Sequence, residues 1–103
     1  MDAQEKNTLL FIQLVIMFHS ATMQQLGKIK NPMTDKIERD LRAAQGSIDL
    51  LEMLQDKTRG NLRDEEARLL GQVLQECRLN YVDEMNKPET TSAPPAEEEQ
   101  KTP

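Results

Sequence analysis

The chain has 103 residues, a length that allows one domain at most. It contains one cysteine and one histidine, which excludes an intramolecular disulfide and supplies a metal site poorly. Of the formal net charge of −5, the five acids and two lysines from Glu84 onward account for −3, so the first 83 residues are nearly balanced, and such a balance argues against binding nucleic acid by phosphate neutralisation.

The first predicted element is a helix over residues 5–26. Gly27 can end this helix, because glycine adopts left-handed dihedrals without a Cβ clash. The Asn31–Pro32 step then disfavours helix, since the residue before a proline is pushed towards extended conformations.

Apolar side chains cover most of the circumference of this first helix. Phe11, Leu14, Val15, Phe18 and Ala21 form one face, and Leu9, Ile12, Ile16, Met23 and Leu26 form another. A helix in a monomeric bundle needs one stripe of little more than about 100°. The second face therefore predicts a further partner.

We expect that partner to be another copy of the chain, because a two-fold dimer buries the same patch on both molecules. The candidate interface of this homo-oligomer, a dimer or higher assembly, consists of Leu9, Ile12, Ile16, Met23 and Leu26. Two alternatives stay open, namely a monomer whose other helices wrap the first one and a protein partner of a different kind.

Neither a membrane span nor a secretory signal is expected. The apolar run from Leu9 to Phe18 is ten residues long and includes Gln13, whereas a transmembrane helix needs about 20 residues. The first residues lack the positive charge with which a secretory signal starts. The expected location is the cytoplasm, a reducing compartment that suits an unpaired cysteine.

The second predicted helix covers residues 36–57. Asp35 is the expected N-cap, with Glu38 at the spacing of a capping box. Steps of four and three residues define its apolar stripe, which consists of Ile37, Leu41, Ala44, Ile48 and Leu51. Gly60 is expected to end the helix.

The third predicted helix covers residues 63–83, with Asn61 or Asp64 as its cap and Cys77 on its apolar face. The turn before it suggests a weaker site, because cations around a glycine next to a helix N-terminus can hold an anion. The residues of this candidate anion site are Lys57, Arg59, Gly60, Asn61 and Arg63. The simpler interpretation is a glycine-capped helix end with cations against its negative pole.

The remaining reactive side chains indicate no catalytic residue. His19 lies beside the apolar face of the first helix and has no nucleophile on its own side. Cys77 is expected to be buried, whereas a reactive thiol needs exposure and positive neighbours. Residues 85–103 contain four of the five prolines and no large apolar residue after Met85, so a disordered acidic tail is predicted there.

One stretch resembles a known family. Residues 48–62, which read IDLLEMLQDKTRGNL, are similar to the core motif of the bacterial domain-of-unknown-function family 1844. Residues 65–70 and the ending Leu79-Asn80-Tyr81-Val82 also resemble that family, over about residues 9–83 in all. The resemblance implies a small helical bacterial protein and no assigned activity.

Together these patterns predict an all-α protein whose helical domain spans residues 1–84. Its fold is an antiparallel three-helix bundle or helical hairpin. The expected function is that of a non-enzymatic, self-associating interaction module or accessory subunit without cofactor, metal, nucleic acid or membrane. The alternative function is binding of a small ligand or anion at the Lys57–Arg63 turn.

Overall fold

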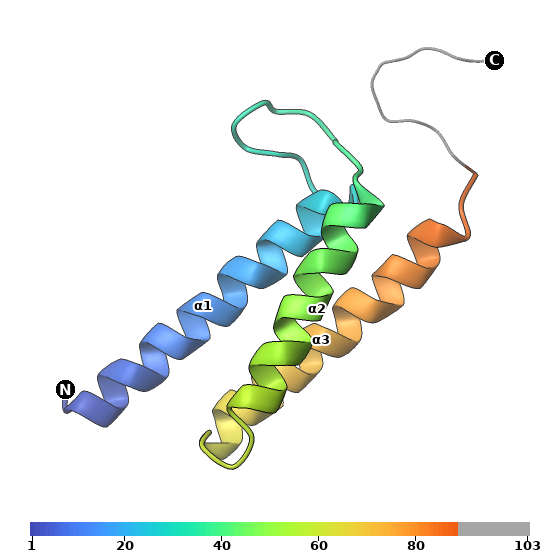
Figure 1. Cartoon of the computed structure of the whole chain (residues 1–103). Helices are drawn as coiled ribbons and strands as arrows, with labels where there is room; N and C mark the ends of the chain where they lie inside the picture. Colours follow the sequence, from blue (N-terminus) through green and yellow to red (C-terminus); the bar gives the residue numbers. More distant parts are fainter. Residues whose placement is uncertain (89–103) are drawn as a thin grey trace.

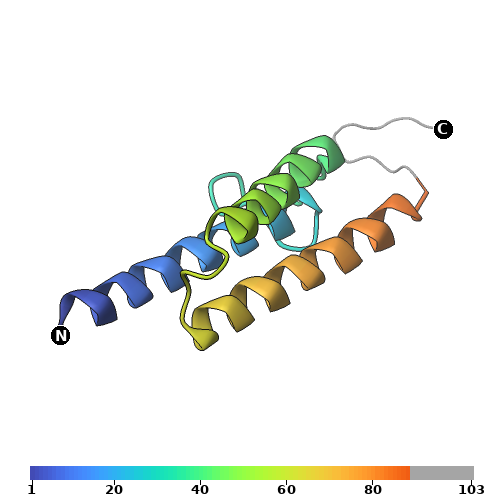
Figure 2. The same cartoon turned by 60° about the horizontal axis from the view of Figure 1, so that its bottom comes forward.

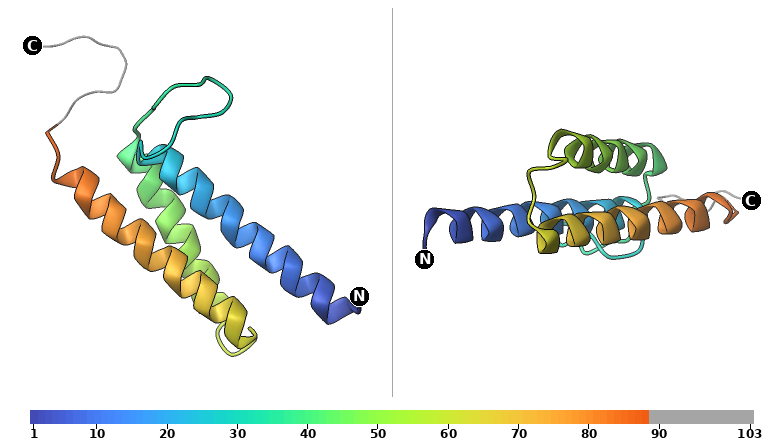
Figure 3. Two further views of the ribbon diagram at one scale, coloured as in Figure 1. Left: turned by 180° about the vertical axis from the view of Figure 1, so that it is seen from behind. Right: turned by 90° about the horizontal axis from the view of Figure 1, so that it is seen from below.

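A computed structural model describes residues 1–88 of the chain as three helices: α1 (Ala3–Gln25), α2 (Leu41–Lys57) and α3 (Asp64–Met85). Each helix contacts the other two, and the chain runs up, down and up (Figure 1). α1 and α3 lie side by side in one layer, and α2 lies in a second layer and contacts both (Figures 2 and 3). Of the two predicted architectures, the structure is the three-helix bundle.

α1 begins two residues before its predicted start because Asp2 and Glu5 form a capping box. The Asp2 carboxylate accepts a hydrogen bond from the Glu5 N–H at 2.8 Å, and the Glu5 carboxylate accepts one from the Asp2 N–H at 3.0 Å. At the far end, Gly27 has a φ of +78°, and a Cβ there would lie 3.3 Å from the Cβ of Arg39. Because glycine has no Cβ, the backbone at Gly27 can pass close to Arg39, which lies later in the connection between α1 and α2.

The predicted start of the second helix at Lys36 is wrong, because α2 begins at Leu41. Its N-cap is Asp40, whose carboxylate accepts from the Ala43 N–H at 3.1 Å. The carboxylate of Glu38 accepts instead from the Asn31 amide at 3.1 Å, within a connection that pairs Asn31 with Lys36. Two aspartates five residues apart both suit a cap locally, and the tertiary pairing of the connection selects the second.

α3 begins at Asp64, and the cap position belongs to Arg63, so both predicted caps are wrong. The Arg63 N–H donates to the Glu66 carboxylate at 2.7 Å. The helix continues to Met85, beyond its predicted end and into the first residue of the predicted tail. Of the remaining predicted tail, residues 86–88 follow the helix without continuing it, and residues 89–103 lie outside the described residues.

A cluster of ion pairs around the buried Glu84 explains why α3 continues. Its carboxylate lies 2.8 Å from the Lys28 Nζ, 2.7 Å from the Lys87 Nζ and 3.7 Å from the Arg39 guanidinium. Burial by itself would raise the pKa of Glu84, but the hydrogen bonds from Lys28 and Lys87 outweigh it and hold that pKa below its usual value. The cluster ties the connection after α1 to the end of α3.

The core is formed where the stripes of the three helices meet. It consists of Val15, Ile48, Leu51, Leu70, Val73, Leu74 and Cys77. The predicted stripe of α2 is buried from Ala44 to Leu51, whereas Ile37 is half exposed because it precedes the helix.

Candidate association surface

The predicted interface on α1 is exposed only in part. Leu9 and Ile16 are about half exposed, whereas Ile12 and Met23 are of intermediate burial. Leu26 is fully buried within its own chain, so it does not belong to an exposed surface. We call the remaining four residues the α3-side strip.

The position of His19 shows which neighbour this strip borders. The His19 Nε2 lies 3.4 Å from a carboxylate oxygen of Glu76 in α3. Residues three, four and seven positions apart share one side of a helix, and Ile12, Ile16 and Met23 stand at these spacings from His19. The α3-side strip therefore follows the edge of α1 that faces α3.

A second exposed strip follows the opposite edge of α1. Leu10, Leu14 and Met17 are 51%, 38% and 61% exposed. The Ser47 hydroxyl of α2 donates to the Gln25 side chain at 2.7 Å, and Ala21, one turn before Gln25, shares a hollow with Ala43 of α2. Steps of four, three and four residues place Leu10, Leu14, Met17 and Ala21 on this α2-facing side.

This second strip was not predicted as a surface. Leu14 and Ala21 were assigned to the packed face, and Leu10 and Met17 to neither face. The regular spacing of the four residues is the signal that could have revealed it. Which strip stayed exposed depended on the rotation of α1 about its own axis. Periodicity does not define that rotation for a helix that is apolar nearly all round.

α2 contacts α1 along its length (Figure 1), and its exposed apolar side chains extend the apolar surface. Leu50, three residues after Ser47, lies on the α1-facing side, and Met53 follows at the outer edge; both are close to half exposed. We define the α1–α2 seam as Leu10, Leu14, Met17, Leu50 and Met53.

Beyond its first turn, which contains Glu5 and Lys6, the exposed surface of α1 is also uncharged. From Asn7 to Gly27 the sequence contains no Asp, Glu, Lys or Arg. Scattered exposed apolar residues are normal on a soluble protein, but a continuous apolar patch indicates an interaction site. A helix side that combines large apolar groups with the absence of charge has the composition of an interface core.

Two of the three cations of the predicted anion site, Arg59 and Arg63, contact groups of their own chain, and the third, Lys57, is exposed. The Arg59 guanidinium pairs with Asp56 at 2.7 Å, and the Arg63 guanidinium donates to the Gln4 side chain at 3.1 Å. The Asn61 N–H donates to the Thr58 carbonyl at 2.9 Å. These groups are therefore committed to partners within the chain.

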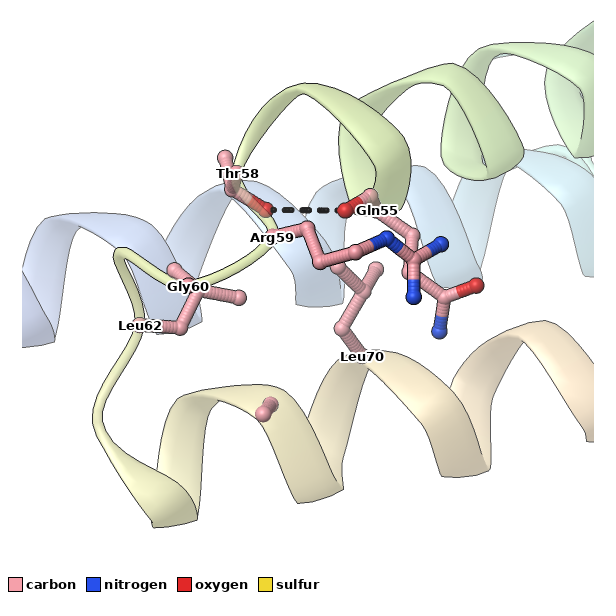
Figure 4. Close-up of a pocket in the computed structure, with 7 residues that line it drawn as sticks. Gln55, Thr58, Arg59, Gly60, Leu62 and Leu70 are labelled. Carbon is pink, nitrogen blue, oxygen red and sulfur yellow. Dashed lines mark hydrogen bonds between the residues drawn. The ribbon is translucent and has the colours of Figure 1, made fainter.

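The hollow at this turn is apolar at its base. Figure 4 shows Leu62 and Leu70 lining it, while the side chain of Arg59 runs beside Gln55 and away from Gly60. Its volume is about 190 Å³. At the nearby start of α3, the Glu66 carboxylate already accepts the Arg63 N–H, which leaves a negative group where an anion would need positive ones.

The two candidate reactive groups have structural positions. Cys77 is buried as predicted, and burial raises the pKa of its thiol. His19 is half-buried against α3, whereas the neighbouring Ser20 is exposed. Among residues 1–88 no three His, Cys, Asp or Glu side chains come together as metal ligands would. None of the described helices combines the length and hydropathy that crossing a bilayer requires.

Comparison with known proteins identifies one family. Residues 8–83 match the model of the family described as Domain of unknown function (DUF1844). The match covers the bundle from the second turn of α1 to near the end of α3. No curated protein and no solved structure matches the chain.

Proposed function

The chain belongs to the DUF1844 family. From the exposed surface of its bundle we propose that it is a non-enzymatic helical interaction module that associates with copies of itself. Such a module would act in the cytoplasm as an accessory subunit or scaffold. The observation that supports the proposal is the outer surface of α1, which carries no Asp, Glu, Lys or Arg from Asn7 onward. Four large apolar side chains on it are at least half exposed, namely those of Leu9, Leu10, Ile16 and Met17.

The energetic argument is the cost of leaving these side chains in water. Full burial of one large apolar side chain contributes about 1.5–3 kcal/mol, so covering the exposed half of each contributes about 1 kcal/mol. Several such contributions are comparable to the total stability of a small domain, which is about 5–15 kcal/mol. Assembly is therefore a strong candidate for the way in which this small bundle gains stability.

Light scattering coupled to size exclusion tests this proposal. The full chain, with a mass of 11.8 kDa, is expected to elute with at least twice that mass at micromolar concentration. A clean monomer across a wide concentration range would refute self-association.

The geometry supports self-association more than the alternative of anion binding at the Lys57–Arg63 turn. Arg59, Asn61 and Arg63 already have partners within the chain. That alternative stays a prediction, and a ligand titration described below tests it.

A further inference from the structure

We propose that a second copy of this chain docks on the α1–α2 seam, with the two α1 helices antiparallel about a two-fold axis that passes between Leu14 and Met17. This inference rests on the proposed function of self-association and goes beyond it by naming the surface and the arrangement. It also differs from the interface expected from the sequence, which lies on the α3-side strip.

The spacing of the apolar residues on α1 supports the two-fold axis. A two-fold interface must be self-complementary, because the same residues meet in reversed order. Leu10, Leu14, Met17 and Ala21 are separated by four, three and four residues, a pattern that is identical when reversed. The axis then places Leu14 opposite Met17 of the second copy and Leu10 opposite its Ala21.

The same reversible spacing on the α3-facing side includes a polar residue. Ile12, Ile16, His19 and Met23 are separated by four, three and four residues, so the reversed order sets Ile16 opposite the His19 that lies 3.4 Å from Glu76. An antiparallel copy on this side would align fewer apolar pairs.

The sizes of the side chains along the seam are complementary in the same arrangement. One end of the seam carries Leu10 and Met53, whereas the other end is continued by small residues, namely Ala21, Ala43 and Gly46. Ala21 and Ala43 line the same hollow, and a Cβ added at Gly46 would meet nothing within 4 Å. Antiparallel packing sets the bulky end of each copy against the small end of the other.

The distribution of charge separates the two sides of α1. On the α2-facing side, the residues of the seam and the adjoining Ala43 and Gly46 carry no charge. Glu38 and Asp40 share the hollow of Ala21 and Ala43, and their carboxylates already accept hydrogen bonds within their own chain. On the α3-facing side, Glu76 pairs with His19 at 3.4 Å and is exposed. The exposed Arg68 lies eight residues before Glu76 in α3, and the exposed Leu79 lies three residues after it.

A copy docked on the α3-facing side would bury these charged groups, and desolvation of charges opposes association unless each charge finds a partner. A copy docked on the seam would desolvate mainly apolar side chains and neutral amides, and the carboxylates of Glu38 and Asp40 in the adjoining hollow are already hydrogen-bonded. The seam is therefore the favoured side.

The area of the seam suits a stable dimer. α1 has 23 residues, which correspond to about 35 Å at about 1.5 Å per residue. α2 has 17 residues, or about 25 Å, and each helix is about 10 Å wide, so the two-helix face has a footprint on the order of 600 Å², comparable to the roughly 800 Å² per partner of a standard interface.

A lipid surface fits this face less well. Helices that lie in a membrane interface carry Lys and Arg along the polar side next to the apolar one, and α1 contains neither from Asn7 to Gly27.

Matched pairs of lysine substitutions in the full chain test the choice of surface. The double variant Leu14→Lys with Met17→Lys changes the seam, and Leu9→Lys with Ile16→Lys makes the same change on the other side of the same helix. We expect the mass of the first variant to fall to that of one chain and the mass of the second to stay at twice that value. Circular dichroism verifies that both variants keep the helical content of the wild type.

The opposite result, in which only the Leu9 and Ile16 variant dissociates, would overturn the inference while leaving self-association intact. A wild-type chain that is already monomeric would overturn both. Dissociation in both variants with intact helices would refute the restriction to the seam.

Cysteine cross-linking tests the arrangement without destabilising substitutions. Differently tagged chains carrying Leu10→Cys and Ala21→Cys are mixed and oxidised, and the wild type with its buried Cys77 is the control. Antiparallel packing sets position 10 of one copy opposite position 21 of the other, so it predicts disulfides between the two kinds of chain. Identical chains should form few, because their cysteines would be separated by the distance from position 10 to position 21, about 17 Å along a helix, and a disulfide needs Cα atoms within about 7 Å. Disulfides formed mainly between identical chains would show parallel packing and refute the proposed axis. A lack of disulfides in a chain that is dimeric by mass would also refute the axis.

Discussion

The stability of the bundle should depend on the buried stripe of α3 much more than on its outer side. Leu74 is 1% exposed and belongs to the core, whereas Leu79, in the same helix, is 64% exposed. Replacing either leucine by alanine removes the same atoms and leaves the α1–α2 seam unchanged. The comparison therefore isolates burial.

The expected magnitudes differ severalfold. Truncation of a fully buried leucine costs about 3–5 kcal/mol, because the lost transfer free energy is joined by the cost of a cavity. The side chain of Leu79 is about one-third buried, so at about 0.8 kcal/mol per buried methylene its truncation costs less than about 1 kcal/mol.

Urea unfolding followed by circular dichroism measures both values, at one protein concentration because association adds to the apparent stability. With a slope of about 1 kcal/mol per molar urea for a domain of this size, Leu74→Ala should lower the midpoint by about 3 M or abolish folding, and Leu79→Ala by less than about 1 M. Equal losses for the two variants would refute the packing of α3 described above.

Two further predictions concern the end of the bundle and the turn before α3. Hydrogen bonds from Lys28 and Lys87 lower the pKa of Glu84. The stability that Glu84 contributes is therefore complete above the ordinary carboxyl pKa of about 4.5 and is lost as the pH falls through the lowered value. The melting temperature of Glu84→Gln should depend less on pH in this acid range than that of the wild type, and parallel pH profiles of the two proteins would contradict the prediction. Inorganic phosphate should leave the melting temperature unchanged at neutral pH, because Arg59 is paired with Asp56; a shift that disappears in Arg59→Ala would instead support anion binding at the turn.

Local sequence patterns were sufficient for the buried stripe of α2 and for the end of α1 at glycine. Steps of three and four residues correctly identified the buried stripe from Ala44 to Leu51, and Gly27, directly after the cap of α1, has the positive φ that ends a helix. These features depend on residues within one or two turns of each other, so the sequence by itself contained the information. The prediction that Gly60 ends the second helix is wrong, because α2 ends at Lys57 with Thr58 as its C-cap and the positive φ of Gly60 belongs to the turn that follows.

The start of α2 and the exposed strips of α1 depended on contacts between distant residues. Asp35 and Asp40 are equivalent as local caps, and the backbone hydrogen bond from Asp40 to Gln25, at 2.7 Å, belongs to the packing that selects the second. A helix apolar nearly all round has no preferred orientation in its own sequence. Only the packing of α2 and α3 decided that Leu26 would be buried and that Leu10, Leu14 and Met17 would remain in contact with solvent.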